Sequence, residues 1–199
     1  DGLRVVRQRG KFMQEACDVT QGGMAAVIGL DEAPTREVCA EAGIVLANLN
    51  CPGQLVISGA ADKIAKACEL AKAKGAKRAI PLTVAGAYHS PLMASAQPKL
   101  AAELAQAKLG APSVPVISNV TAQAHGNDIA AKLVEQVCAS VRWEESMRAL
   151  LAQGYTRFIE LGPGSALSGF MKRIDKTATM INVSDAASLE AAVKTLSAA

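Results

Sequence analysis

Residues 48–59 have the sequence NLNCPGQLVISG, in which two short apolar runs flank a Pro-Gly pair. Proline presets φ and glycine accepts the left-handed conformation, so this pair favours a tight turn. We therefore expect a β-hairpin, with residues 44–49 as one strand and residues 55–58 as the other. This hairpin decides how the chain around it is organised.

One strand and one helix are expected on each side of the hairpin. Before it, residues 24–30 are predicted as a strand and residues 34–42 as a helix. After it, apolar spacing predicts an amphipathic helix around residues 64–71 and a last strand at residues 78–84. The order strand, helix, strand, strand, helix, strand is that of a ferredoxin-like unit, which we place at residues 22–85.

Residues 1–21 and 86–199 are expected to form a second α/β subdomain around this unit. An amphipathic helix opens the chain, and Ser90-Pro91 is typical of the start of a helix, here expected to run to about Lys108 with a bend at Pro98. The further expected elements are a buried strand at 114–120, helices at about 128–138 and 144–153, a strand at 157–161, a helix at 165–174, a strand at 180–183 and a helix after Asp185.

Composition excludes several classes of function. Half of the 199 residues are apolar and only 3% are aromatic, and the 21 Lys and Arg against 18 Asp and Glu form no basic block. We therefore expect no nucleic-acid partner, and no apolar run is long enough to predict a membrane partner. Five cysteines without a CxxC pair indicate reduced thiols and a cytoplasmic location, and no spacing predicts a metal site.

Arg9 occupies an unusual place on the first helix. Its neighbours at three and four residues' distance are Val5, Val6, Phe12 and Met13, so helical geometry turns the guanidinium towards the apolar side. A guanidinium in such surroundings needs an anion.

His89 follows a predicted strand and directly precedes the helix start at Ser90-Pro91. The partial positive charge of a helix N-terminus disfavours imidazolium, which predicts a neutral histidine that accepts a proton near pH 7. A histidine merely packed at a strand end is the alternative. The other histidine, His125, lies in a polar turn and is expected to be exposed.

A nucleophile for this histidine is not evident. A nucleophile elbow requires Gly-x-Ser-x-Gly, and Ser165 and Ser168 do not fit that spacing. Cys51, in the hairpin turn, is expected to be the most exposed thiol, but no basic residue flanks it to lower its pKa. The turn 162–164 (Gly-Pro-Gly) before a helix offers free N–H groups to an anion, although a structural turn is the favoured interpretation.

Four motifs in this order resemble the malonyl-CoA:acyl-carrier-protein transacylase family of bacterial fatty acid synthesis, and the resemblance covers essentially the whole chain. They are RGKFMQ at 9–14, NLNCPGQLVISG at 48–59, GAYHSPLM at 86–93 and ELGPG at 160–164. The resemblance implies an α/β fold in which a ferredoxin-like subdomain is inserted into a hydrolase-like α/β subdomain.

The resemblance also implies an activity, namely transfer of a malonyl group from coenzyme A to the phosphopantetheine thiol of an acyl carrier protein through a malonyl-serine ester. His89 would be the general base, Gln136 would orient it through its backbone carbonyl, and Arg9 would bind the malonyl carboxylate. Tyr88 replaces a phenylalanine common in the family. Coenzyme A thioester is then a substrate, and no bound cofactor or metal is expected.

One part of the family pattern is missing. The family's serine belongs to a Gly-His-Ser-x-Gly motif upstream of the first helix, and this sequence begins after that motif. The family's oxyanion-hole donors lie in the same upstream part. We therefore expect a fragment, or a natural relative without the nucleophile, that is inactive by itself. The alternative function is a non-catalytic module that binds a carboxylate or a carrier protein.

Overall fold

The computed structural model describes residues 1–197. They fall into two compact units, one of residues 1–146 and one from residue 147 onwards. Residues 198 and 199, the end of the predicted second subdomain, lie outside the described residues. Each unit is described by itself below.

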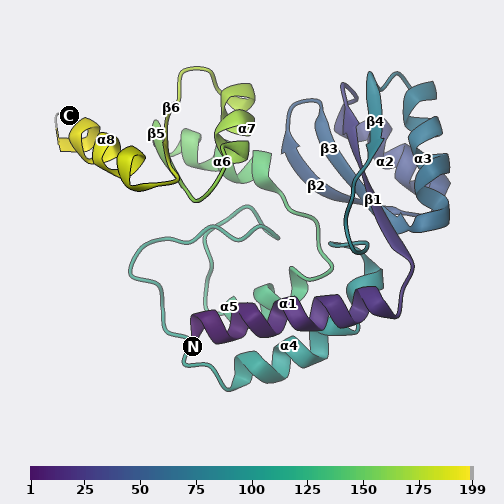
Figure 1. The fold of residues 1–199 in the computed structure, drawn as a ribbon, viewed down its shortest axis with the longest axis horizontal. Coiled ribbons are helices and arrows are strands. Elements are labelled where there is room, and N and C mark those ends of the chain that lie inside the picture. The colour runs from purple at the N-terminus through teal and green to yellow at the C-terminus, as the bar shows by residue number, and fades with distance from the viewer. Residues whose placement is uncertain (198–199) are drawn as a thin grey trace. The chain divides into compact units, whose positions relative to one another are not determined.

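The first unit contains a four-stranded antiparallel sheet in the order β2-β3-β1-β4 (Figure 1). Its strands are β1 (Gly22–Ile28), β2 (Val45–Cys51), β3 (Gln54–Ala60) and β4 (Arg78–Pro81). The turn between β2 and β3 has Gly53 at φ 65°, the left-handed conformation that a residue with a Cβ adopts only with strain. The predicted hairpin is therefore confirmed.

Helices α2 (Glu32–Ala42) and α3 (Ala61–Ala73) pack against the sheet, as Figure 1 shows. Alternation along the strands sends every second side chain to these helices. The resulting core holds Ala25, Val27, Leu55 and Ile57 from the sheet with Val38, Ile64 and Ala67 from the helices. The predicted ferredoxin-like order of elements is present, and Met24 and Val56 face the opposite side of the sheet.

Helices form the other part of the first unit. Helix α1 (Gly2–Asp18) lies alongside α4 (Ala96–Ala105), and a 3-10 turn η1 (Pro91–Met93) and α5 (Ile129–Glu135) complete the layer. The buried residues of this layer are Met13, Ala16, Cys17, Met93, Ala96, Leu100, Leu104 and Val137. The apolar face predicted for the first helix is thus partly used for packing.

Two predicted elements are wrong. The helix expected from Pro91 to Lys108 is two elements, η1 and α4, and Pro98 lies in the first turn of α4, where its missing N–H leaves no bond unmade. The strand expected at 114–120 is a loop. Its Ser118 N–H donates to Gln123 and its Val116 carbonyl accepts from His125, so the segment turns back on itself instead of joining a sheet.

Helix α6 (Trp143–Ala152) leads from the first unit into the second. The second unit has a parallel pair of strands, β5 (Arg157–Leu161) and β6 (Thr179–Val183), with helices α7 (Ala166–Ile174) and α8 (Ala186–Ser197). These elements agree with the predicted ones to within a residue or two at their ends.

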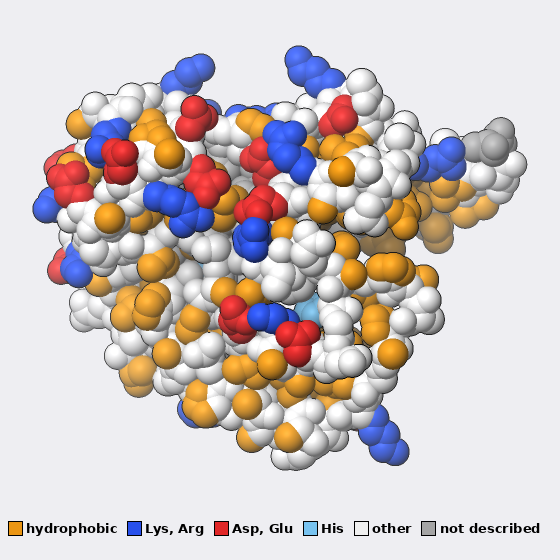
Figure 2. All heavy atoms as spheres, turned by 180° about the vertical axis from the view of Figure 1, so that it is seen from behind, with side chains coloured by type: hydrophobic (Ala, Val, Ile, Leu, Met, Phe, Trp, Pro, Cys, Tyr) orange, Lys and Arg blue, Asp and Glu red, His pale blue; other side chains and the backbone are white. Residues whose placement is uncertain are grey.

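Acidic and basic side chains alternate over the face drawn in Figure 2 rather than gathering by sign.

A search of the described helices found none that is both long and apolar enough to cross a membrane.

Candidate active site

A cavity of about 430 Å³ in the first unit brings together residues from distant parts of the sequence. It lies on the sheet face that Met24 occupies, away from α2 and α3. Its lining residues are Arg9, Gly10 and Met13 from α1, Met24 from β1, Asn48 from β2, and Tyr88 and His89 from the loop before η1. The two residues that the sequence singled out, Arg9 and His89, therefore share one cavity.

Arg9 is half-buried, and burial lowers the pKa of its guanidinium. Within residues 1–197 it forms no ion pair or hydrogen bond, whereas Arg4, earlier on the same helix, is paired with Glu103. A guanidinium carries five donors and stays charged in proteins. The cavity thus holds a cation whose donors are open to an incoming anion.

His89 is half-buried and has φ 56°, in the left-handed region that non-glycine residues seldom adopt. Its Nδ1 lies 3.1 Å from the carbonyl oxygen of Gln136 and 3.1 Å from that of Ala139. Because carbonyl oxygens only accept hydrogen bonds, Nδ1 carries the proton in the neutral ring. Nε2 therefore keeps its lone pair and is able to accept a proton.

Burial is the main reason why the pKa of His89 lies below its usual value, and the positive charge of Arg9 lowers it further. The bonds to the carbonyls of Gln136 and Ala139 act in the opposite direction. The sequence predicted a neutral histidine because of a helix N-terminus, but η1 has only three residues, and its N-terminal donor at Leu92 is met by the Ser90 hydroxyl. Desolvation, not a helix dipole, is the cause.

Gln136 follows the last residue of α5, and its carbonyl contacts His89 as described above. Its side-chain amide also donates to the carbonyl of Ala139, at 3.2 Å. The sequence analysis missed Ala139, because a backbone carbonyl on an alanine leaves no signature in the sequence. It also gave no role to Met24 or Asn48, although Asn48 opens the second of the four motifs.

Two expectations about single residues are wrong. Cys51 is fully buried at the end of β2, because alternation along the strand turns it inward. His125 is half-buried, since its N–H bond to the Val116 carbonyl folds the loop back over it. Neither residue lines the cavity, and within residues 1–197 no serine or cysteine does.

The Gly-Pro-Gly turn lies in the second unit, and its neighbouring helix already has an anion. The carboxylate of Glu160 accepts from the N–H groups of Leu167 and Ser168, at 3.0 and 2.8 Å, and from the Ser168 hydroxyl, at 2.5 Å. These bonds hold the pKa of Glu160 below its usual value. The N-terminus of α7 is capped by the protein itself, which supports the structural interpretation of this turn.

A search of residues 1–197 for three or more metal-ligating side chains close together found no such group. The polar side chains that line the cavity are the imidazole of His89, the guanidinium of Arg9, the amide of Asn48 and the phenol of Tyr88.

Comparison with known proteins gives the chain a family context. The family model described as "Acyl transferase domain" matches residues 1–194. A malonyl CoA-acyl carrier protein transacylase of Bacillus subtilis (strain 168) is 48% identical over 98% of this chain. Its Escherichia coli (strain K12) counterpart is 42% identical, also over 98%.

Solved structures agree with these relatives. MCAT from Streptococcus pneumoniae superposes with a TM-score of 0.93 at 39% identity, over 98% of this chain and 66% of its own. A malonyl-transacylase in complex with its type II polyketide acyl-carrier protein gives 0.93 at 38% identity, over 96% of this chain and 64% of its own. The chain spans about 64% of the length of the Bacillus relative and 65% of the Escherichia relative.

Proposed function

The chain belongs to the acyl transferase domain family, and on that premise we propose that it is the histidine- and arginine-bearing part of a malonyl-CoA:acyl-carrier-protein transacylase. The observation that carries the proposal is the shared cavity of His89 and Arg9, in which a base and an unpaired cation face one space. A malonyl thioester has the matching groups, since it carries an electrophilic carbonyl and a free carboxylate.

In the proposed reaction His89 moves a proton at Nε2 in each half of the cycle. A serine hydroxyl attacks the thioester carbonyl and gives its proton to Nε2, and the coenzyme A thiolate leaves with that proton. The carrier's phosphopantetheine thiol then gives its proton to Nε2 as its sulfur attacks the malonyl-serine ester, and the serine oxygen recovers the proton. No redox step and no cofactor is needed.

The depressed pKa of His89 suits this role, because the ring is already neutral when substrate arrives. The carbonyls of Gln136 and Ala139 hold Nδ1, so the ring presents Nε2 as the only free nitrogen. In this scheme Gln136 is a positioning residue rather than a group that touches substrate.

Arg9 would bind the malonyl carboxylate. A guanidinium fork matches a carboxylate in a bidentate way, and a partly buried one gains more from the pairing than an exposed one. Met13, Met24 and Tyr88 line the same cavity and offer apolar surface to the acyl chain. This division of roles distinguishes malonyl from acetyl thioesters, since an acetyl group has no carboxylate.

The proposed partners follow from the relatives. We infer that the acyl donor is malonyl-CoA and the acceptor an acyl carrier protein, because the transacylase that superposes on 96% of this chain was solved with such a carrier. A cytoplasmic location is proposed with them, supported by the five cysteines, which form no disulfide among residues 1–197.

The serine is tested first, because the proposal requires it. The chain is expressed together with its upstream coding sequence and incubated with radiolabelled malonyl-CoA. We expect an acid-stable, base-labile malonyl-enzyme with the label on a serine of a Gly-His-Ser-x-Gly motif. The absence of that motif in frame, or of any labelled enzyme, would remove the transfer activity from this protein. A non-catalytic module is not favoured, because the relatives are transacylases.

A further inference from the structure

A short segment ties the imidazole of His89 to the edge of the four-stranded sheet. It consists of Ala139, Ser140 and Val141 and is called the strap below. At one end the Ala139 carbonyl accepts from His89 Nδ1, at 3.1 Å. At the other end the strap is bonded to β2, an outer strand of the sheet.

Three hydrogen bonds join the strap to β2. The Ser140 hydroxyl donates to the carbonyl of Leu46 at 2.5 Å. The Val141 N–H donates to the Ala47 carbonyl at 2.8 Å, and the Val141 carbonyl accepts from the Leu49 N–H at 2.9 Å. The first of these is the only one made by a side chain, so it is the one a substitution removes.

A β-bulge makes this arrangement possible. In a regular strand successive carbonyls point to opposite edges, so two adjacent carbonyls would not both face the strap. The pairing of β2 with β3 shifts register between Leu46 and Asn48, and the adjacent carbonyls of Leu46 and Ala47 both accept bonds from the strap. Bulges of this kind commonly re-aim groups next to active sites.

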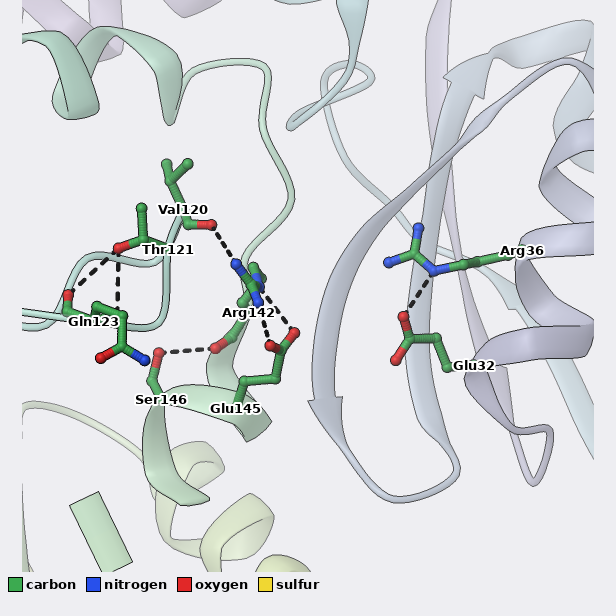
Figure 3. A network of polar contacts seen from close by, with 8 residues as sticks. All are labelled: Glu32, Arg36, Val120, Thr121, Gln123, Arg142, Glu145 and Ser146. Atoms are coloured by element: carbon green, nitrogen blue, oxygen red, sulfur yellow. Dashed lines mark hydrogen bonds and ion pairs between the residues drawn. The ribbon is translucent and has the colours of Figure 1, made fainter. Parts of the chain in front are cut away.

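The residue after the strap is fixed as well (Figure 3). Arg142 donates through its N–H to Asn119 and through Nη1 to the Val120 carbonyl, and it is paired with Glu145. Those contacts hold the far side of the strap against the loop before it. The chain therefore has little freedom at Val141 and at Arg142, the residue after the strap, and Ser140 is the anchor closest to the Ala139 carbonyl.

The peptide group that carries the Ala139 carbonyl is the bond between Ala139 and Ser140, and it is planar. Anchoring Ser140 therefore sets the direction in which that oxygen points. We propose that Ser140 is a positioning residue for His89: its hydroxyl, bonded to the bulged strand β2, aims the Ala139 carbonyl at Nδ1 as the second of two acceptors. Only the catalytic role of the imidazole rests on the proposed function; the contact between Ser140, the Ala139 carbonyl and His89 does not.

Two acceptors on one N–H restrain the ring more than one does. With the Gln136 carbonyl alone, the ring has one bond about which to tilt, and Nε2 moves relative to the cavity. With the Ala139 carbonyl added, tilting towards either oxygen lengthens the bond to the other. The sheet edge thus sets the direction of Nε2 through the strap.

A measurement on the unmodified chain of 199 residues tests the contact itself. The carbonyl ¹³C resonances of Gln136 and Ala139 are followed by NMR while the pH is lowered through the titration of His89. The chain has only two histidines, so His125 serves as an internal reference and an H125Q variant assigns the signals. We expect both carbonyls to shift with the His89 midpoint. An Ala139 carbonyl that does not follow His89 would overturn the proposal without any variant.

The role of Ser140 is tested by S140A, with S140T as the variant that keeps the hydroxyl. Since the carbonyl bonds raise the pKa of His89, we expect S140A to lower that pKa further and to reduce the share of the Nδ1–H tautomer, and S140T to restore both. T35V is the control, because it removes a buried hydroxyl on α2 that donates to the backbone carbonyl of Asp31, away from His89. If S140A, folded by circular dichroism, titrates like the unmodified chain, Ser140 has no positioning role.

Activity gives a separate reading once the serine-bearing protein is in hand. We expect S140A to reduce kcat about tenfold with KM for malonyl-CoA unchanged, because a misdirected base slows proton transfer without weakening carboxylate binding. A protein that transfers no malonyl group at all would end the proposed function but leave the NMR result standing. A kcat that stays unchanged although the His89 titration has moved would overturn the positioning role.

Discussion

Two charged side chains, Arg9 in the first unit and Glu160 in the second, differ in how their charge is met. Glu160 accepts three hydrogen bonds from the start of α7, so its charge stabilises the turn before that helix. Arg9 is half-buried, lines a cavity and has no ion pair or hydrogen bond among residues 1–197. From the sequence, Arg9 and the turn at 162–164, which directly follows Glu160 and Leu161, were considered as places where an anion could bind.

The difference teaches where to look for function in this chain. A charge that the protein satisfies itself stabilises the fold, and a ligand would have to displace those bonds to use it. A half-buried cation without a partner among residues 1–197 is partly desolvated, so an incoming anion gains more from pairing with it than with an exposed cation. The proposed site therefore lies in the first unit, although the second unit carries a motif just as prominent in the sequence.

The largest effect is expected from His89→Ala in the serine-bearing protein that we propose. Loss of the general base should reduce malonyl transfer by about 10²- to 10⁴-fold. His125→Ala is the matched control, since it removes the other histidine, which lies outside the cavity. Transfer is measured by the rate of label moving from malonyl-CoA to carrier protein. Equal rates for the two variants would take His89 out of the mechanism.

Arg9→Ala should weaken binding of malonyl-CoA about 10- to 100-fold, since a hydrogen bond to a charged group contributes about 1.5–3 kcal/mol. Calorimetric titration measures it, with acetyl-CoA as the ligand that lacks the carboxylate. Arg7→Ala on the same helix is the control, because Arg7 is exposed and does not line the cavity.

The contrast with Glu160 breaks down if Arg9→Ala weakens both thioesters equally. Arg9 would then contribute general electrostatics rather than recognition of a carboxylate.

Glu160→Ala should destabilise the start of α7 by about 1 kcal/mol, the usual value of a lost helix cap. Hydrogen exchange at the amides of Leu167 and Ser168 should then quicken about fivefold, because that free energy corresponds to such a factor. Glu190→Ala on α8 is an exposed control. Unchanged exchange would show that the bonds to Glu160 are not what orders this turn.

The smallest expected effect is on the pH dependence of stability, in which His89 and Glu160 act in different pH ranges. The pKa of His89 is lowered on folding, so the unfolded chain binds more protons just below pH 6.5, and the free energy of unfolding should fall as pH decreases through that range. The pKa of Glu160 is lowered from 4.5, so its contribution is present above that value and lost at more acidic pH.

Urea unfolding at a series of pH values measures the free energy of unfolding as a function of pH. We expect H89Q to flatten this dependence around pH 6.5 and E160Q to flatten it around pH 4.5 and below. If H89Q leaves the profile between pH 5.5 and 7 unchanged, burial of the imidazole does not shape the stability of the first unit.

Much of the fold was predictable because it depends on local signals. The hairpin at Pro52-Gly53, the helix stop at Gly43 and the two strands of the second unit follow from turn residues and apolar periodicity, although the parallel pairing of those two strands was not predicted. The strand expected at 114–120 failed because an apolar run becomes a strand only if a neighbouring strand accepts its hydrogen bonds, and here the run bonds to its own loop. Pairing is a property of the folded chain, not of the run.

The candidate site was predictable only in part, and for a similar reason. Side chains with distinctive chemistry, His89 and Arg9, stand out in a sequence, and the motifs around them led to the family that the comparisons confirmed. The carbonyl of Ala139 and the serine hydroxyl beside it do not stand out. Their importance arises from direction, which a bulge in β2 sets across more than 90 residues of chain.

Taken alone, the sequence determined which groups are available: a histidine able to take a proton, an arginine on an apolar helix face, and the order of strands and helices around them. Those are consequences of side-chain chemistry and local periodicity, which neighbours in the chain settle. Only the tertiary structure decided that both groups open into one cavity and that Nδ1 of His89, rather than Nε2, is held by carbonyl oxygens. It also decided that the Glu160 carboxylate accepts hydrogen bonds from the N-terminus of α7. Desolvation and hydrogen-bond direction depend on what packs around a group, and that is set by residues far away in sequence.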